Sequence, residues 1–227
     1  MLRSRERFLA AGHYSPVVDL VDALTPAGDD LRLLDSGCGT GYYLGALLER
    51  RTGWEALALD VSVDAVAIAT RAAAVPGLVA DVWQPLPVRD QRADVVLCVF
   101  APRNAHEFAR VLSPAGRLVV VTPAAEHLVQ LRERGRLIGI QADKLAHLDD
   151  ALGERFTLER RESLRYDVSL DAQEVAALAT MGPSGHHGRS ADDEAGDETR
   201  VGAGEDGGGR TTVTVSVDVS VYRHSGA

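Results

Sequence analysis

The stretch "LRLLDSGCGTGYYLGALLE", residues 31–49, decides the fold. An apolar run that ends in Asp35 is followed by glycines at every second position, Gly37, Gly39 and Gly41, and then by a helix-like pattern. Glycine permits positive φ and lets a ligand approach the main chain, and a helix N-terminus presents free N–H groups. The pattern predicts a strand–turn–helix unit that holds a ligand against its backbone.

The spacing of these glycines separates three classes of ligand site. A P-loop needs Gly-Lys-Ser/Thr, and the turn has no lysine. A dinucleotide fingerprint, GxGxxG, would need glycine where Tyr42 stands. What remains is GxGxG preceded by Asp35, with a second acid, Asp60, at the end of the next strand-like run. A carboxylate at that position can accept hydrogen bonds from both hydroxyls of a ribose, so the pattern favours a nucleoside ligand.

Strand-like and helix-like runs alternate through the first half of the chain. The predicted strands are 31–35, 55–60, 77–81, 93–100 and 116–123. The predicted helices are 42–51, 63–74 and 104–113. Such alternation is typical of βαβ units, and it predicts an α/β fold with a mostly parallel sheet and helices on both faces.

The second half is less regular. Residues 124–151 and 170–181 look helical, and 155–168 has the mixed alternation of a possible strand. Residues 182–210 are rich in Gly, Asp and Glu, which predicts a mobile loop with an acidic segment at 189–210. The last stretch, 211–223, alternates strictly and predicts a long strand, antiparallel to its neighbours, that closes the sheet edge in a hairpin.

The composition is that of an ordinary globular protein. The chain has 227 residues, 45% of them hydrophobic and 25% charged, enough for one domain or one domain with an appendage. No apolar run reaches the ~18 residues of a membrane helix, and the N-terminus lacks the apolar core of a secretory signal. Cys38 and Cys98 form no CxxC pair, which favours a cytoplasmic protein with reduced thiols and no metal site. The net charge of −9 disfavours nucleic-acid binding by overall charge, so local arginine clusters matter more.

Four segments resemble the class I S-adenosylmethionine (SAM) methyltransferases. They are "LLDSGCGTG", "ALALD", "VAD" and "LPVRDQRADVVLCVFAP", within residues 31–123. The resemblance implies a Rossmann-like fold with a seven-stranded sheet, mostly parallel, whose C-terminal strand is antiparallel. It also implies SAM as cofactor, with S-adenosylhomocysteine (SAH) as product, and a glycine turn that makes room for the methionine part.

The cofactor-binding residues that this resemblance implies lie at the ends of the predicted strands and before the first of them. They are Tyr14, Asp35, Gly37, Cys38, Gly39, Gly41, Tyr42, Asp60, Val61, Asp81 and Phe100. Structural alternatives stand beside some of these assignments. Asp60 could cap the following helix, although Ser62 could also do so; Asp81 could be a solvated loop acid; and Cys38 could be only a small turn residue.

A longer set of segments is similar to a narrower family, the 23S rRNA guanine-N1 methyltransferases, which include macrolide-resistance enzymes of antibiotic producers. The segments are "RERFLAAGHYSPV" (5–17), "GCGTGYY", the run from 100 to 133, and "ATMGPSGHH" (179–187). The similarity implies methyl transfer to N1 of a guanine in a ribosomal RNA hairpin, with rRNA or the large subunit as partner and a homodimer as the assembly. The chain departs from the family in two respects: it has two cysteines where members usually begin with a zinc-binding domain, and it carries the acidic segment.

We expect residues 1–30 to form a helical segment over the cofactor site and 31–227 to form the SAM-binding domain. The candidate catalytic residues are His13, Phe100 and Pro102, because "GHY" could fold over the cofactor and because "FAP" ends the fourth strand, where open α/β sheets bind ligands. Phe100 could stack on a base or only pack. Equally, His13 could cap a helix, and Tyr14 could belong to the core.

Further histidines and arginines are weaker candidates. His127 follows the fifth strand, but the pattern favours a helix-surface histidine; His186 and His187 are expected in a solvated loop. The possible phosphate contacts are residues 132–136, Arg155, Arg160, Arg161 and Arg165, which could equally be a solvated face. Three functions are therefore weighed: methylation of guanine N1 in 23S rRNA, methylation of a small secondary metabolite by the same fold, and SAM binding without catalysis.

Overall fold

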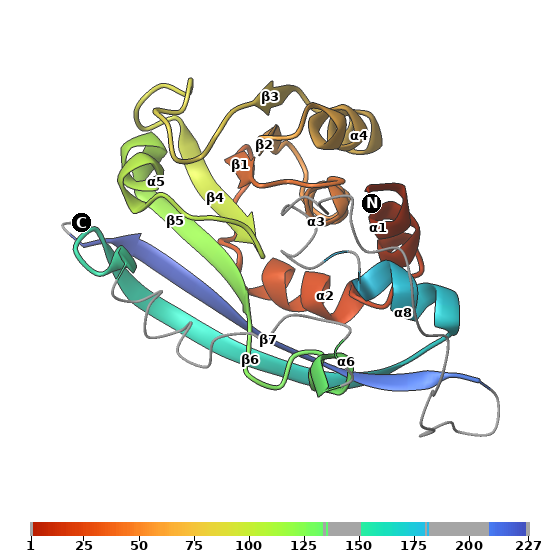
Figure 1. Cartoon of the computed structure of the whole chain (residues 1–227). Helices are drawn as coiled ribbons and strands as arrows, with labels where there is room; N and C mark the ends of the chain where they lie inside the picture. Colours follow the sequence, from red (N-terminus) through yellow and green to blue (C-terminus); the bar gives the residue numbers. More distant parts are fainter. Residues whose placement is uncertain (1, 134, 136–150, 180, 182–208, 226–227) are drawn as a thin grey trace, which may run out of the picture.

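The computed structural model describes residues 2–133, 135, 151–179, 181 and 209–225. Seven strands of these residues form one sheet in the order β3-β2-β1-β4-β5-β7-β6 (Figure 1). They are β1 (Arg32–Ser36), β2 (Glu55–Asp60), β3 (Gly77–Val79), β4 (Ala93–Val99), β5 (Leu112–Pro123), β6 (Phe156–Leu170) and β7 (Thr211–His224). The first five pair in parallel, and β7 is antiparallel to both β5 and β6. The predicted sheet, with its antiparallel C-terminal strand, is confirmed.

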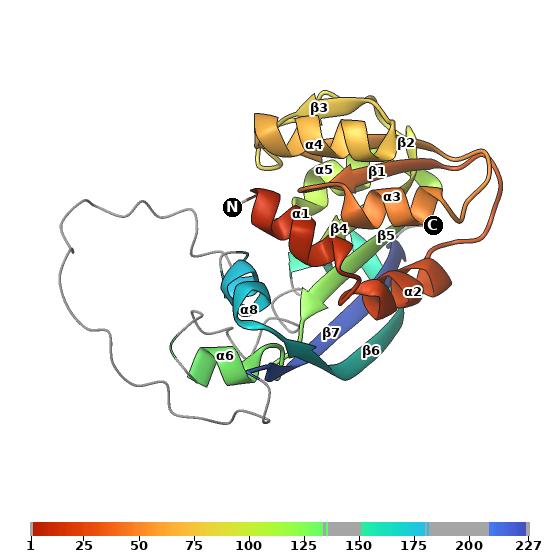
Figure 2. The ribbon, with the colours of Figure 1, turned by 90° about the vertical axis from the view of Figure 1, so that its right-hand side faces the viewer.

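Helices cover both faces of this sheet. The described helices are α1 (Leu2–Ala10), α2 (Ser15–Leu24), α3 (Tyr42–Leu48), α4 (Val63–Ala73), α5 (Ala105–Val111), α6 (Val129–Glu133) and α8 (Ala172–Ala179). Figure 2 shows α1, α2 and α3 on one face and α5 behind the sheet, which agrees with the two separate hydrophobic clusters on opposite faces. Among the described helices, none is both long and apolar enough to cross a membrane.

Strand β4 explains why the core has two halves. Its residues Val95, Leu97 and Val99 belong to one cluster, while Val96 and Cys98 belong to the other. A parallel strand that is covered on both faces needs apolar side chains at every position. The continuous run "VVLCV" (95–99) meets that requirement, whereas a half-exposed strand would alternate.

Strand β7 alternates because its two faces differ. Five valines, at 213, 215, 217, 219 and 221, pack into the cluster beneath α1 and α2. The opposite face is polar but buried, and it bonds to β6: Ser163 Oγ donates to Asp218 Oδ1 at 2.5 Å, and Thr214 Oγ1 donates to Asp167 Oδ1 at 2.8 Å. The strand predicted over 211–223 is confirmed, but its placement at the sheet edge is wrong, because β7 lies between β5 and β6 and β6 forms the edge.

The N-terminal segment is fastened across the carboxyl ends of the strands. Tyr166 on β6 donates its hydroxyl hydrogen bond to the carbonyl of His13 at 2.9 Å. Arg5 on α1 donates to the carbonyl of Met181 at 3.0 Å. His13 Nε2 lies 2.7 Å from Glu174 Oε1 on α8. These three contacts place α1 against α8, as Figure 1 also shows.

The predicted helix over 124–151 needs correction, and most of the predicted loop over 182–210 lies outside the described residues. In the described part of the predicted 124–151 helix, residues 125–128 form a turn, while Val129–Glu133 and Ala151 are helical. Residues 182–208, which include most of the predicted acidic loop at 189–210 together with His186 and His187, lie outside the described residues.

Candidate active site

The glycine turn lies where the strand order of the sheet reverses. Strand β1 pairs with β2 on one side and with β4 on the other, and open α/β sheets bind ligands outside the carboxyl ends of the strands at such a point. The backbone N–H groups of Gly37 and Cys38 both donate to the carbonyl of Leu59, at 2.7 and 2.9 Å. The end of β2 therefore fixes the path of the turn.

The three glycines of the turn all have positive φ, but a side chain at each position would meet different neighbours. A Cβ on Gly37 would lie 2.3 Å from the Cβ of Ala101, and a Cβ on Gly41 would lie 2.8 Å from the Cα of Ala69 on α4. Packing within the protein thus requires glycine at both positions. A Cβ on Gly39 would meet only Arg5 Nη1, at 3.3 Å. Gly39 is therefore the glycine whose backbone is open to a ligand.

Asp60 ties the end of β2 to both neighbouring turns. Its Oδ2 accepts a hydrogen bond from the Gly39 N–H at 3.0 Å, and its Oδ1 accepts one from the Ser62 N–H at 2.9 Å. Ser62 is the N-cap of α4, since its Oγ accepts from the Ala65 N–H. The capping alternative for Asp60 is therefore wrong, and its carboxylate keeps lone pairs free for further donors.

Exposed apolar side chains surround Asp60 and Asp81. Val61, Val63 and Trp83 are 65%, 67% and 62% exposed. Asp81 is itself exposed, and its Oδ1 accepts from the backbone N–H of Trp83 at 3.0 Å. Exposed apolar residues beside polar acceptors are typical of a site for a flat ligand such as adenine. The sequence patterns singled out Val61 and Asp81 but not Val63 or Trp83.

Asp35 and Cys38 lie beneath the turn. Burial, and to a smaller extent the charge of Asp60, raises the pKa of Asp35 to about 7. Burial also raises the pKa of the Cys38 thiol, so this side chain stays protonated. Cys38 is 8% exposed, which fits its reading as a small residue of the turn.

Phe100 directly follows β4 and has an unusual backbone. Its φ is +53°, and its ring is 42% exposed. The ring stacks on His127, with centroids 5.8 Å apart and planes at 27°, and it meets the rings of Tyr14 and Tyr43 edge-on. An aromatic side chain at positive φ is strained, so the neighbours of Phe100 must hold it in this conformation.

His127 is a site residue that the sequence pattern placed wrongly. It is 8% exposed and lies in the turn before α6, not on a helix surface. Its Nδ1 accepts from the Ser216 N–H at 3.2 Å, and its Nε2 lies 3.5 Å from the Tyr14 hydroxyl. Burial, with a contribution from Arg132, lowers the pKa of His127 to about 4. The imidazole is therefore neutral above that pH.

The remaining candidate residues lie around the ring cluster of Tyr14, Tyr43, Phe100 and His127. His13 is bonded to Glu174, Pro102 is exposed just after Phe100, and Tyr42 packs edge-on against Tyr43. Tyr14 is buried, as its packing alternative expected, and also contacts Phe100. The structure thus brings Tyr14 and Phe100 together at the carboxyl ends of the strands, with His13 hydrogen-bonded to Glu174.

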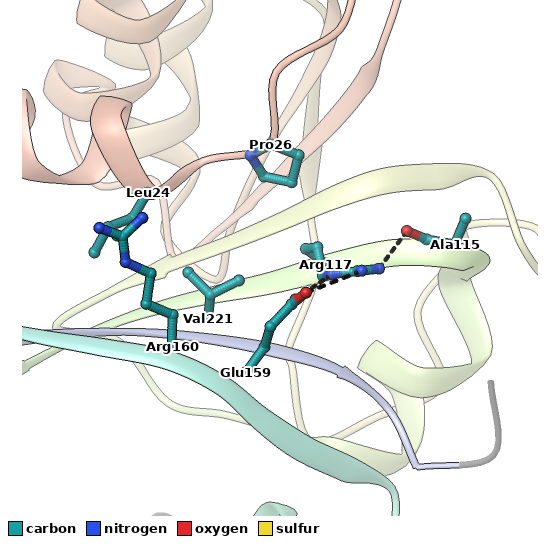
Figure 3. A pocket seen from close by; sticks show the side chains of 7 residues that line it. All are labelled: Leu24, Pro26, Ala115, Arg117, Glu159, Arg160 and Val221. Atoms are coloured by element: carbon teal, nitrogen blue, oxygen red, sulfur yellow. Dashed lines mark hydrogen bonds and ion pairs between the residues drawn. The ribbon is translucent and has the colours of Figure 1, made fainter.

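The arginines of β6 do not form one basic surface. Arg160 pairs with Glu162 and Arg165 with Glu126, while Arg161 donates to Ser220 Oγ and to the Tyr222 hydroxyl. A shallow pocket at the opposite end of the sheet is lined by Arg117, Glu159 and Arg160, and Figure 3 shows Glu159 reaching Arg117 while Arg160 extends toward Leu24. This pocket is remote from the glycine turn. Within the described ranges no group of three or more His, Cys, Asp or Glu side chains could hold a metal ion.

The fold and the glycine site define a class I SAM-dependent methyltransferase. Residues 34–120 match the methyltransferase domain family. A solved methyltransferase structure from Bacillus halodurans superposes with a TM-score of 0.60 at 16% identity, over 91% of this chain and 97% of that one.

Two curated relatives identify the family within that class. A relative from Micromonospora griseorubida, named for 23S rRNA (guanine-N1) methylation, is 39% identical over 98% of this chain and 79% of its own length. The 23S rRNA (guanine(748)-N1)-methyltransferase of Streptomyces fradiae is 38% identical over 82% of this chain and 69% of its own length. The chain belongs to the 23S rRNA (guanine-N1)-methyltransferase family.

Proposed function

We propose that this protein transfers the methyl group of SAM to N1 of a guanine in 23S rRNA. The observation that carries the proposal is the position of Phe100. Its exposed ring follows the end of β4, one residue before Ala101, whose side chain packs against Gly37 of the cofactor turn. A flat acceptor that stacks on this ring would lie beside the methyl donor. The two relatives named for guanine-N1 methylation support the choice of acceptor.

The residues around the glycine turn fit SAM. The backbone at Gly39 leaves room for the methionine part, and Arg5 stands beside it with a positive charge. The Asp60 carboxylate can accept hydrogen bonds from the ribose hydroxyls. The exposed side chains of Val61 and Trp83, with Asp81, would hold the adenine. SAM supplies the methyl group on a sulfonium leaving group, so the protein's task is to align the acceptor nitrogen with it.

Guanine N1 carries a proton that it must lose for methylation to occur. In a base pair N1 is hidden, so the target guanine must lie in a loop or be flipped out of its stack. The cluster of aromatic side chains formed by Tyr14, Tyr43 and Phe100 at the carboxyl ends of the strands suits a flipped base. Phe100 would stack on the base, while Pro102 and His13 remain candidates for contacts at its edge. Such an activity would place the protein in the cytoplasm, with the large ribosomal subunit as its partner.

The test is a methylation assay with the purified chain, labelled SAM and unmodified large-subunit rRNA. We expect label in the RNA, and mass mapping should place it on one guanine. Alanine has no ring on which the base could stack, so a Phe100→Ala variant should lose most of the methyl transfer to RNA while it still binds SAH. Absence of label in RNA, together with transfer to another acceptor, would contradict the proposal.

A second candidate function is methylation of a small molecule by the same site. It is favoured by the net charge of −9 and by the ion pairs that occupy Arg160 and Arg165, since neither charge is free for phosphate. The salt dependence of acceptor affinity separates the candidates. An RNA substrate should lose affinity steeply as salt rises, whereas an uncharged small acceptor should not.

A further inference from the structure

Two Phe–His pairs stack face to face in the described part of the chain. Phe100 stacks on His127 with ring centroids 5.8 Å apart, and Phe156 stacks on His224 with centroids 5.6 Å apart. The interplanar angles, 27° and 22°, are similar. The second pair lies where β6 begins and β7 ends, and Phe156 is only 2% exposed. Phe100 differs in being 42% exposed and in having a positive φ.

The strained backbone of Phe100 needs neighbours that hold it. A residue in a sparsely populated backbone region persists only where its surroundings determine its position, and such strain concentrates at functional sites. One hydrogen bond fixes the main chain, from the Phe100 N–H to the Val121 carbonyl at 3.1 Å. The rings of Tyr14 and Tyr43 meet the Phe100 ring at steep interplanar angles of 84° and 68°, with centroids 6.4 and 6.5 Å away. Among the described ring contacts of Phe100, the contact with His127 is the stacked one.

His127 is in turn fixed to β7. Backbone hydrogen bonds to β7 flank His127 in the chain. Before it, the Ala124 N–H donates to the Ser216 carbonyl at 3.0 Å, and after it, the Leu128 N–H donates to the Thr214 carbonyl at 2.7 Å. The Ser216 N–H donates to His127 Nδ1, which places the proton of the neutral ring on Nε2, toward the Tyr14 hydroxyl. The ring orientation is therefore set by the backbone of a central strand.

We propose that His127 is a positioning residue that holds the Phe100 ring as a platform, so that the acceptor base, Phe100 and His127 form a stack of three rings. This inference rests on the proposed function and specifies how the acceptor is held. It requires a flat heteroaromatic acceptor, because an aliphatic or carboxylate acceptor gains little from a stacked platform. Histidine suits the position because a single side chain supplies both a ring face and an acceptor for the Ser216 N–H.

Two substitutions at position 127 separate the ring from the hydrogen bond. His127→Asn removes the ring but keeps an oxygen where Nδ1 lies, so the thermal midpoint should change little while kcat/KM for rRNA falls roughly 10- to 100-fold. His127→Phe keeps the ring face but leaves the buried Ser216 N–H without its acceptor. The thermal midpoint should fall, while kcat/KM stays within roughly threefold of the wild type. Phe100→Leu should lower kcat/KM by roughly as much as His127→Asn.

The matched control is His224→Asn, which makes the same change at the remote Phe156 stack and should leave kcat/KM unaltered. Calorimetric titration with SAH should give wild-type affinity for the His127 and His224 variants. The inference is overturned if His127→Asn keeps full activity, if activity follows the thermal midpoint across both His127 variants, or if SAH affinity falls in parallel with activity. A wild-type protein that methylates no RNA contradicts the proposed function and this inference together, whereas an active wild type with unimpaired Phe100→Leu and His127→Asn contradicts this inference alone.

Discussion

Asp60 Oδ2 accepts a hydrogen bond of 3.0 Å from the backbone N–H of Gly39, so the acid at the end of β2 is joined directly to the glycine turn. The same carboxylate holds the Ser62 N–H at the start of α4 through its other oxygen. One side chain thus sets the shape of the turn, and under the proposed function its remaining lone pairs would bind the ribose. Substitution of Asp60 should then change both the cofactor affinity and the shape of the turn.

Asp60→Asn should therefore weaken SAH binding. An amide has one oxygen, so either Gly39 or Ser62 loses its acceptor and faces an NH2 group instead. We expect SAH affinity to fall on the order of 100-fold and the free energy of unfolding to fall by about 1–3 kcal/mol. Calorimetric titration and urea unfolding measure the two effects. Asp64→Asn removes an exposed charge four residues away and should change neither; unaltered SAH affinity in Asp60→Asn would refute the assignment.

Alanine at Gly41 should mainly lower stability, whereas alanine at Gly39 should mainly abolish SAH binding. At Gly41 the new Cβ would meet the backbone of Ala69, and the residue would keep a φ of +77°, so the free energy of unfolding should fall by roughly 3 kcal/mol. At Gly39 the new Cβ meets only the end of the Arg5 side chain, so the loss should be about 1 kcal/mol. SAH binding should be abolished in Gly39→Ala. A Gly39→Ala protein with wild-type SAH affinity would show that the ligand does not approach this residue.

Arg5 is expected to bind the carboxylate of the cofactor's methionine part. Its Nη2 donates to the Met181 carbonyl, and it forms no ion pair with an acid in the described parts of the chain. Arg5→Gln should weaken SAH binding by roughly 10-fold, because a charged hydrogen bond is lost, but should leave adenosine binding unchanged, since adenosine has no carboxylate. Arg7→Gln on the exposed side of α1 is the control. Equal weakening of SAH and adenosine would contradict the assignment.

Asp35 should make stability depend on pH. Its pKa is raised to about 7 by burial and by Asp60, whereas in the unfolded chain it titrates near ~4. Between these values the folded protein binds the proton more tightly, so this group lowers the free energy of unfolding as pH rises from about 4 to 7, by at most roughly 4 kcal/mol. His127, with its pKa lowered to about 4, contributes a slope of opposite sign between about pH 4 and 6.5. The prediction therefore concerns the difference between Asp35→Asn and the wild type.

Urea unfolding at several pH values measures that difference. Asp35→Asn should become progressively more stable than the wild type as pH rises from 4 to 7, and the gain should be constant above pH 7. A constant difference over the whole range would mean that Asp35 is not protonated in the folded protein at mildly acidic pH. Asp64→Asn, which changes an exposed acid, should show no such trend.

The sequence could predict those parts of the site that depend on neighbours along the chain. The glycine spacing and the acid at the end of β2 arise within one βαβ unit, and the alternation at 211–223 follows from the two faces of β7. His127 could not be placed this way, because its burial and its hydrogen bond come from Ser216 on a strand that follows much later in the chain. Arg5 beside Gly39 is likewise a contact between distant segments. The positive φ of Phe100 is set by ring contacts, which local propensity does not include.

The most direct test of the account is to identify the methylated nucleoside. Large-subunit rRNA lacking the modification is incubated with the protein and SAM, digested to nucleosides, and resolved by liquid chromatography and mass spectrometry against the isomeric methylguanosine standards. The account predicts 1-methylguanosine, formed in proportion to enzyme and strongly reduced in Asp60→Asn at SAM concentrations below saturation. Methylation at another position of guanine, on another base, or on no RNA at all would contradict it.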